Sequence, residues 1–279
     1  MKFVAGLFEI IAGIFFPGPL ILIPIILFIG GPVLIILCRK GEISIRGGWR
    51  LFFGSLILTG IAGYFYLDIK YPTYSWRQKL TIEVETPQGI VSGSSVVSVK
   101  WETVRSKPLT TAPGASFSIK GEATAVALPN GRYLFALLKG AEVFALHRFA
   151  EDKILHQYPH NWERYLPAAA DIAKHKGETR ILQMPNYPML VTFGDINDPT
   201  SVKKVDPANL AEQFGPGVSL KSITMTITNE PVTTGKLEDV LAWWAGYENK
   251  QLDGDKYTDF YAKNRLANSL NRRDFKTGK

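Results

Sequence analysis

Residues 79–86 read KLTIEVET, and this stretch decides how the larger part of the chain folds. Its apolar residues alternate with polar ones, so an extended segment has one apolar face and one face turned to water. This period of two predicts a half-buried β-strand. Residues 87–89 supply a turn through proline and glycine, and the alternation resumes over residues 97–101. The sequence therefore predicts a β-hairpin at the start of a folded domain.

A second hairpin is predicted from residues 117–128 and 132–138, which are joined at Pro129-Asn130-Gly131. Asn-Gly between apolar runs is a strong hairpin signal because both residues tolerate a positive φ. Further strands are predicted at residues 189–193 and 223–228.

Helices are predicted between and after these strands. Asn161 is the expected cap of a helix running to about residue 175, and Asp206 with Pro207 opens a short helix ending near residue 214. Two more helices, at about 236–249 and 258–271, close the chain. The predicted fold class is α+β, with a mainly antiparallel sheet and packed helices.

The first 67 residues differ in character from the rest. Apolar residues fill three segments, about 3–16, 20–38 and 51–67, and Pro17-Gly18-Pro19 separates the first two. A membrane core of about 30 Å needs about 20 apolar helical residues. We therefore predict N-terminal transmembrane helices, formed by two or three of these segments, with the lipid bilayer as a partner.

Sidedness is predicted from four basic residues between the second and third segments. They are Arg39, Lys40, Arg46 and Arg50, and the positive-inside rule places such a linker in the cytoplasm. The chain after residue 67 is then expected in the periplasm of a bacterium, held at the inner membrane. A cleaved signal peptide is the alternative for the N-terminus, but no small-residue cleavage site follows the apolar run.

The predicted organisation after residue 67 is a juxtamembrane linker at 68–78, a folded domain at 79–262 and a basic tail at 263–279. The formal net charge of +7 divides into +3 for residues 1–67, +5 for the tail and −1 for the chain between them. A basic groove on the folded domain is therefore not expected, and we predict no nucleic-acid partner. The single cysteine, Cys38, excludes an intramolecular disulfide.

Three side chains are candidates for contacts with other molecules or other helices. Glu9 is the one ionisable residue in the first apolar segment, where it predicts a helix-packing contact or an intramembrane polar site. Trp243 and Trp244 are adjacent in a predicted helix and point in different directions. One of them is then expected in the core and the other against a partner or a membrane surface.

Metal and catalytic motifs are incomplete in this sequence. His156 and His160 have the i, i+4 spacing of a helical zinc pair, but Pro159 between them disfavours the helix. Asp253-Gly254-Asp255 with Asp259 has the spacing of a calcium loop but lacks its closing glutamate. Neither a Walker loop nor Gly-x-Ser-x-Gly occurs. We predict no cofactor and no metal.

Several short runs resemble a pattern found in uncharacterised bacterial proteins that carry an N-terminal membrane or export segment. The runs are Asp195-Ile196-Asn197-Asp198-Pro199, Val205-Asp206-Pro207, Phe214-Gly215-Pro216-Gly217-Val218, Pro231-Val232-Thr233-Thr234-Gly235 and Ser92-Gly93-Ser94-Ser95-Val96. The resemblance covers most of residues 79–244 and implies an exported bacterial domain. Because that family has no assigned activity, the resemblance carries over no catalytic residue. The apolar region here is longer than the single anchor of that family.

The leading functional hypothesis is a membrane-anchored periplasmic binding or scaffolding protein without enzymatic activity. Other envelope proteins are its expected partners, and homo-oligomerisation stays open. The alternative is an envelope hydrolase whose site assembles only in the fold. Its candidate residues are His147, His156, His160, Asp195 and Asp198. A histidine and two carboxylates brought together in one cleft would favour that alternative.

Overall fold

The computed structural model describes residues 35–37, 39–41, 44–70, 72–104, 114–157 and 161–278. The chain divides into two compact units, residues 1–73 with 102–114 and residues 74–101 with 115–279. The predicted apolar segment 3–16, most of segment 20–38, and Glu9 lie outside the described residues.

The prediction of transmembrane helices needs a correction. The apolar run 51–67 forms part of α4 (Ile45–Lys70), which also takes in Arg46 and Arg50 from the predicted linker. Glycine, serine and threonine interrupt the apolar residues along this helix. Among the described residues no helix is long and apolar enough to cross a membrane, and this finding overturns the predicted transmembrane helix at 51–67.

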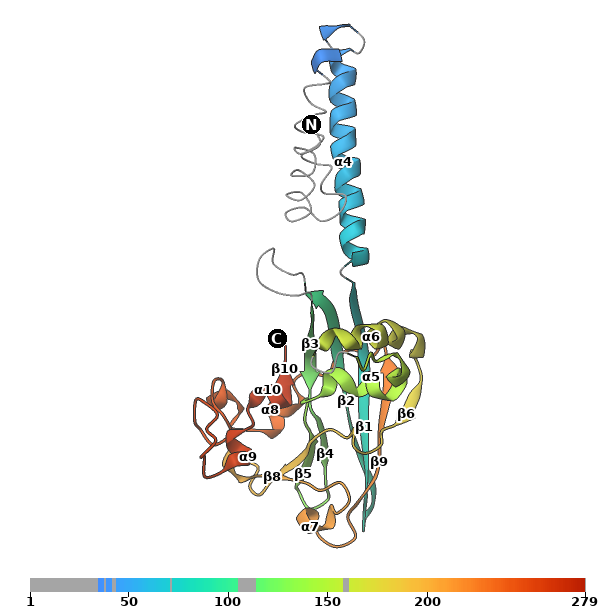
Figure 1. Ribbon diagram of the computed structural model, residues 1–279. Helices are drawn as coiled ribbons and strands as arrows, with labels where there is room; N and C mark the ends of the chain where they lie inside the picture. Colours follow the sequence, from blue (N-terminus) through green and yellow to red (C-terminus); the bar gives the residue numbers. More distant parts are fainter. Residues whose placement is uncertain are drawn as a thin grey trace. The chain divides into compact units, whose positions relative to one another are not determined.

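The second unit is α+β, with antiparallel pairing in both of its sheets. The larger sheet has six strands in the order β10-β3-β2-β1-β9-β6 (Figure 1). Their bounds are β1 (Thr73–Thr86), β2 (Gly89–Val104), β3 (Gly114–Glu122), β6 (Thr179–Ile181), β9 (Ser219–Thr228) and β10 (Lys276–Thr277). The long β1 lies between β2 and β9, so strands far apart in the sequence meet along it.

Alternation along β1 gives the sheet its buried face, as the sequence predicts. Ile82 and Val84 have no exposed surface and Leu80 is also buried. β9 runs antiparallel to β1, and this register places Ile82 beside Ile223 and Leu80 beside Met225, both of which are buried. Cross-strand apolar pairs of this kind stabilise a sheet.

Two helices cover this buried face, α5 (Ala141–Phe149) and α6 (Leu166–Ile172), as Figure 1 shows. Trp101 is fully buried beneath them, and its indole Nε1 donates to the Glu142 carbonyl at 3.1 Å. Gln78 is buried as well, and its Nε2 donates to the Ala141 carbonyl at 2.7 Å. The carbonyls at the start of α5 thus provide acceptors for buried side-chain donors of the sheet.

The smaller sheet has four strands in the order β4-β5-β7-β8. These are β4 (Thr124–Ala127), β5 (Tyr133–Ala136), β7 (Leu190–Phe193) and β8 (Val202–Lys204). The predicted turn at 129–131 joins β4 to β5, and Gly131 has a φ of +76° there. The predicted strand 117–128 is instead two strands, because the chain leaves β3 at Glu122 and enters β4 in the other sheet.

A close backbone approach accompanies this change of sheet. Gly93 of β2 lies so near β4 that a Cβ atom at this position would meet the Ala125 carbonyl oxygen at 2.1 Å. Only glycine fits such an approach without a shift of the backbone.

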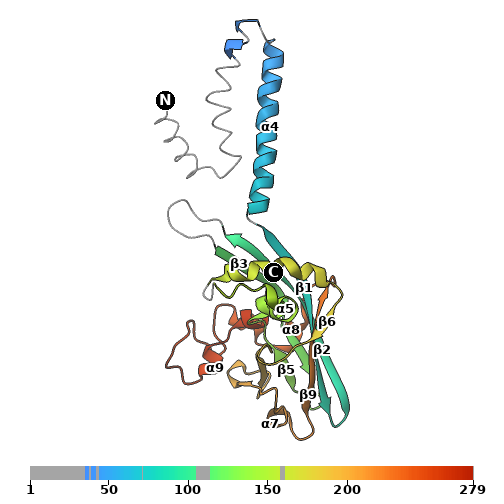
Figure 2. The ribbon, with the colours of Figure 1, turned by 45° about the vertical axis from the view of Figure 1, so that its right-hand side comes forward.

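The chain after residue 235 builds a second apolar core on the smaller sheet. Its short helices are α8 (Lys236–Val240), α9 (Arg265–Asn268) and α10 (Arg272–Phe275), together with the 3-10 turn η7 (Trp244–Tyr247). Phe135, Phe193 and Phe275 pack edge-to-face or stacked within this core. Residues 263–278 thus include buried side chains of the fold, and the segment lies beside the smaller sheet in Figures 1 and 2.

Two predicted helices are shorter than expected. The helix predicted at 236–249 ends as α8 at Val240, since Leu241, Trp243 and Trp244 are all buried and one helix cannot turn all three toward the same core. The helix predicted at 258–271 is reduced to α9, and α10 begins only after it, at Arg272. Asp259 accepts from the Tyr261 amide at 2.9 Å, one of the side-chain bonds to the backbone that compete with a helix.

Candidate functional site

The structure does not bring the predicted hydrolase residues together. His147 lies on α5 with its ring 5.7 Å from Tyr165, and burial lowers the pKa of its imidazole. His156 is exposed in a turn, and His160 lies outside the described residues. Asp195 and Asp198 lie in the turn between β7 and β8, where their carboxylates accept the amides of Asn197 and Thr200, both at 2.9 Å.

The incomplete calcium motif is also explained by turns. Asp253 accepts from the Asp255 amide at 3.1 Å, as expected of an Asx-turn. Within the described ranges no group of three or more histidine, cysteine or acidic side chains could hold a metal ion.

Both tryptophans of the predicted contact pair are buried, rather than one being exposed. Trp243 donates from Nε1 to the Ile196 carbonyl at 3.1 Å, and Trp244 lies beneath the Arg272 guanidinium, 4.6 Å from its ring centroid. They pack in the second core because consecutive residues face it once the helix has ended.

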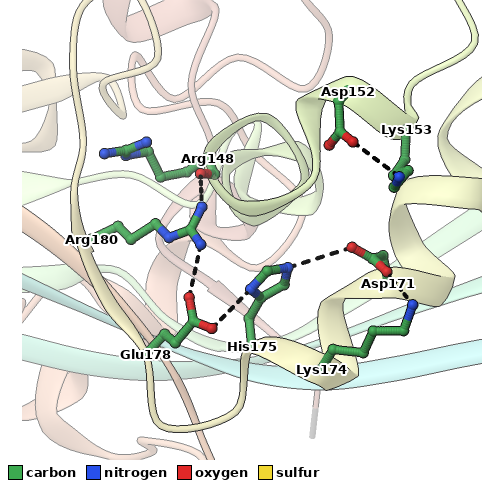
Figure 3. Close-up of polar contacts among 8 residues, drawn as sticks. All are labelled: Arg148, Asp152, Lys153, Asp171, Lys174, His175, Glu178 and Arg180. Atoms are coloured by element: carbon green, nitrogen blue, oxygen red, sulfur yellow. Dashed lines mark hydrogen bonds and ion pairs between the residues drawn. The ribbon is translucent and has the colours of Figure 1, made fainter.

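A histidine does lie between two carboxylates, at a place that the sequence did not indicate (Figure 3). His175 ends η5 (Ala173–His175), the 3-10 turn that follows α6. Its Nδ1 lies 3.1 Å from Glu178 Oε1, and its Nε2 lies 3.5 Å from Asp171 Oδ2 without the alignment of a hydrogen bond. Asp171 reaches it along one helical turn, and Gly177, with a φ of +86°, turns the chain so that Glu178 returns to it.

Cations pair with both carboxylates from the other side. Lys174 Nζ lies 2.6 Å from Asp171 Oδ1, and this hydrogen bond is the main reason why the pKa of Asp171 is lowered. Arg180 Nη2 lies 2.8 Å from Glu178 Oε2 and likewise lowers the pKa of Glu178. Arg180 also donates to the Arg148 carbonyl at 3.2 Å, which ties the network to the end of α5.

This network differs from a catalytic triad in one respect that matters. In a triad one imidazole nitrogen faces a carboxylate and the other faces the nucleophile. Here each ring nitrogen of His175 faces a carboxylate, so neither is directed at a serine or threonine hydroxyl. The arrangement is that of an ion-pair network that fixes the turn between α6 and β6.

Beside this turn is a pocket of about 520 Å³, which we call the Arg77 pocket. Its lining includes Ser75, Arg77, Ser98, Lys176, Thr228 and Asn229. Lys176 directly follows His175, so the ion-pair network sets the position of its backbone. Two cations and several hydroxyl and amide groups therefore share one hollow, and the pocket-lining residues among those described include no acidic side chain.

Arg77 is held in place by the strand that lies next to it. β1 places Arg77 opposite Thr228 of β9, and its Nη1 donates to the carbonyls of Asn229 and Glu230 at 3.0 and 3.1 Å. A guanidinium has five N–H donors, so about three remain for another acceptor. The carbonyls orient the guanidinium but do not neutralise its charge.

Sequence reasoning missed the residues of this site. The spacing of Asp171, His175 and Glu178 is a local signal that could have indicated the ion-pair network. Arg77 and Lys176 are far apart in the sequence. They share a pocket because β1 pairs with β9 and because the turn before β6, where the Gly177 amide donates to the Ile227 carbonyl, also lies against β9. No local pattern marks such a pair.

Comparison of the chain with family models, curated proteins and solved structures finds no match. The resemblance to uncharacterised exported bacterial proteins accordingly stays a prediction from the sequence.

Proposed function

We propose that the folded domain is a binding module that takes an anionic ligand in the Arg77 pocket. One observation carries the proposal. Arg77 and Lys176 line the same hollow, and the described residues that line it include no carboxylate. Two cations in one concavity attract an anion, although both side chains are exposed to solvent, which moderates the attraction.

The pocket chemistry suits a small oxyanion group on a larger molecule. Arginine binds carboxylate or phosphate through two parallel hydrogen bonds, whereas lysine acts as a point charge. Hydroxyls of Ser75, Ser98 and Thr228 add neutral donors. A volume of about 520 Å³ is in the range of ligand pockets, which is roughly 300–1,000 Å³.

The ion-pair network around His175 supports binding rather than turnover. It fixes the backbone of the turn that carries Lys176 before the ligand arrives, and a preformed backbone lowers the entropy cost of binding. Its histidine is engaged by carboxylates on both sides. The Arg77 pocket therefore acts as a recognition site in this proposal.

The test is a titration of the full chain, in neutral detergent, with inorganic phosphate and with glycerol phosphate. We expect Lys176→Gln and Arg77→Gln each to weaken binding by about tenfold, the loss of one charge-assisted contact. Lys221→Gln is the matched control, because Lys221 is a β9 cation paired with Glu83 at 3.3 Å and does not line the pocket. Equal affinity of wild type and Lys176→Gln, or no binding of either probe, would overturn the proposal.

A cellular location at the bacterial inner membrane, with the folded domain in the periplasm as part of an envelope complex, is a second proposal. It is supported by the apolar composition of residues 1–34 and the basic residues that follow them. Replacement of Cys38 by serine and of the exposed Lys203 by cysteine leaves a single reporter thiol. An impermeant maleimide should label it in cells with a permeable outer membrane, and labelling only after lysis would contradict this location.

A further inference from the structure

A second hollow, of about 350 Å³, lies in the C-terminal segment, and we call it the C-terminal hollow. Four of its lining residues are cations, namely Lys250, Lys256, Arg272 and Arg273, while Glu248 is its one acidic side chain among the described lining. The lining thus has a net charge of +3. Such a concentration of like charge in a concave site is stabilised when an anion binds.

Uncharged polar groups are interspersed with these cations. Asn249, Gln251 and Asn271 also line the hollow. Gln251 donates from Nε2 to Thr258 Oγ1 at 3.1 Å, but its Oε1 is buried and has no hydrogen-bond partner among the described residues. Because this oxygen has almost no accessible surface, the side-chain amides of Asn249 and Asn271 are the uncharged groups offered to ligand hydroxyls.

An aromatic side chain forms one side of the hollow. Tyr257 is 72% exposed, and the Lys256 ammonium lies 5.5 Å from its ring centroid. An exposed aromatic ring offers a flat apolar face, onto which the C–H face of a sugar ring packs. The hollow therefore combines an apolar face, amides and cations.

Hydrogen bonds connect the backbone segments around the hollow. The Gln251 amide donates to the Asp255 carbonyl at 2.7 Å, and the amide of the fully buried Leu252 donates to the Ala267 and Leu270 carbonyls at 3.0 and 2.9 Å. Asn271 forms a capping box with Asp274 at the start of α10, which fixes the backbone that carries Arg272 and Arg273. The backbone that carries the lining residues is thus ordered before a ligand binds.

We propose that the C-terminal hollow binds an acidic saccharide, that is, a sugar chain bearing carboxylate, sulfate or phosphate groups. The cations bind the acidic groups, while the Asn249 and Asn271 amides and the Glu248 carboxylate bind the hydroxyls. Tyr257 packs against a sugar ring. This site is separate from the Arg77 pocket, with which it shares no lining residue.

The experiment is calorimetry of the full chain in neutral detergent with four probes. These are a tetramer of galacturonic acid, a sulfated disaccharide, the neutral maltotetraose and inorganic phosphate. Phosphate is measured in the Lys176→Gln variant, whose Arg77 pocket is weakened. Either acidic sugar should bind at least about tenfold more tightly than maltotetraose or phosphate, because only it engages both the cations and the hydroxyl-binding groups. Comparison of the galacturonic acid tetramer with the sulfated disaccharide shows whether the hollow prefers carboxylate or sulfate groups.

Substitutions locate the binding. Tyr257→Ser and Arg273→Gln should each weaken binding of the preferred sugar about tenfold. Tyr261→Ser and Lys263→Gln are matched controls, since both residues are exposed nearby and neither lines the hollow. Lys176→Gln should leave sugar binding unchanged and Tyr257→Ser should leave phosphate binding in the Arg77 pocket unchanged, so failure of one proposal is distinguishable from failure of the other.

Three results would overturn the inference. The first is phosphate binding to the hollow as tightly as the acidic sugars, which makes it a general anion site. The second is equal binding by wild type and Tyr257→Ser. The third is binding of vesicles of anionic phosphatidylglycerol or of single-stranded RNA, lost in Arg273→Gln, without binding of either acidic sugar.

Discussion

Glu122 joins three parts of the fold through one buried carboxylate. Its side chain is 0% exposed, and it accepts the amides of Gly235, Lys236 (3.0 Å) and Leu237 (3.3 Å) at the start of α8. Lys276 of β10 lies 3.1 Å from it and also pairs with Glu238. The residue therefore holds α8 and the C-terminal strand to the end of β3.

Replacement of Glu122 by alanine should lower the free energy of unfolding by about 3–5 kcal/mol, because buried amide donors and a partly buried lysine lose their acceptor. Glu238→Ala removes the exposed partner of the same lysine and should cost less than about 1 kcal/mol. Denaturant unfolding of both variants measures the difference. Equal, small losses would show that Glu122 is not the anchor of this region.

At the scale of elements, the turn between α6 and β6 depends on charge. The pKa values of Asp171 and Glu178 lie below the unfolded values of 3.8 and 4.5, chiefly through hydrogen bonds from Lys174 and Arg180 respectively. Depressed carboxyl pKa values stabilise the fold above the unfolded pKa. That contribution is lost as the pH falls below about 4.5 through the folded values.

The Glu178→Gln variant should therefore be less stable than wild type near neutral pH, and the difference should shrink as the pH is lowered below about 4.5. Denaturation at a series of pH values from about 7 to about 3 measures this. Glu212→Gln, at an exposed position of α7 (Ala211–Phe214) outside this turn, is the control. A difference for Glu178→Gln that is constant across the series contradicts the electrostatic explanation.

The strands were predictable where alternation is strong, as in β1 and β9, because one face of each meets the core. Elements whose ends depend on tertiary packing could not be predicted from the sequence. β3 and β4 read as one strand, since nothing local to Glu122 indicates that the chain passes from one sheet to the other. Helix propensity around 236–249 was overridden when Leu241, Trp243 and Trp244 all became buried.

The candidate site was less predictable than the fold. Sequence reasoning sought catalytic residues and metal ligands, and it excluded a basic groove from the near-zero net charge of the folded domain. A net charge averages over the surface, however, and it does not report two cations that strand pairing brings into one hollow. In the sequence, Arg77 and Lys176 look like ordinary surface residues, and only the folded sheet brings them together.

For the whole second unit, the last residues of the chain are part of the core. Phe275 has no exposed surface and packs against Phe135 and Phe193. Its ring is part of the second apolar core. A segment that composition describes as a basic tail thus supplies structural side chains.

Phe275→Ala should lower the free energy of unfolding by about 3–5 kcal/mol, as expected of a large buried aromatic residue. Lys263→Ala, in the same segment but exposed, should change it by less than about 0.5 kcal/mol. Thermal and denaturant unfolding report both. A loss for Phe275→Ala no larger than that of the control would mean that the segment does not contribute to the core.

The central claim is that Arg77 and Lys176 together form an anion site. Anomalous diffraction from crystals of the full chain soaked in selenate, without competing sulfate or phosphate, tests it most directly. We predict a selenium peak in the Arg77 pocket of the wild type that is weaker in Lys176→Gln soaked at the same selenate concentration. A wild-type map without a peak in that pocket contradicts the claim.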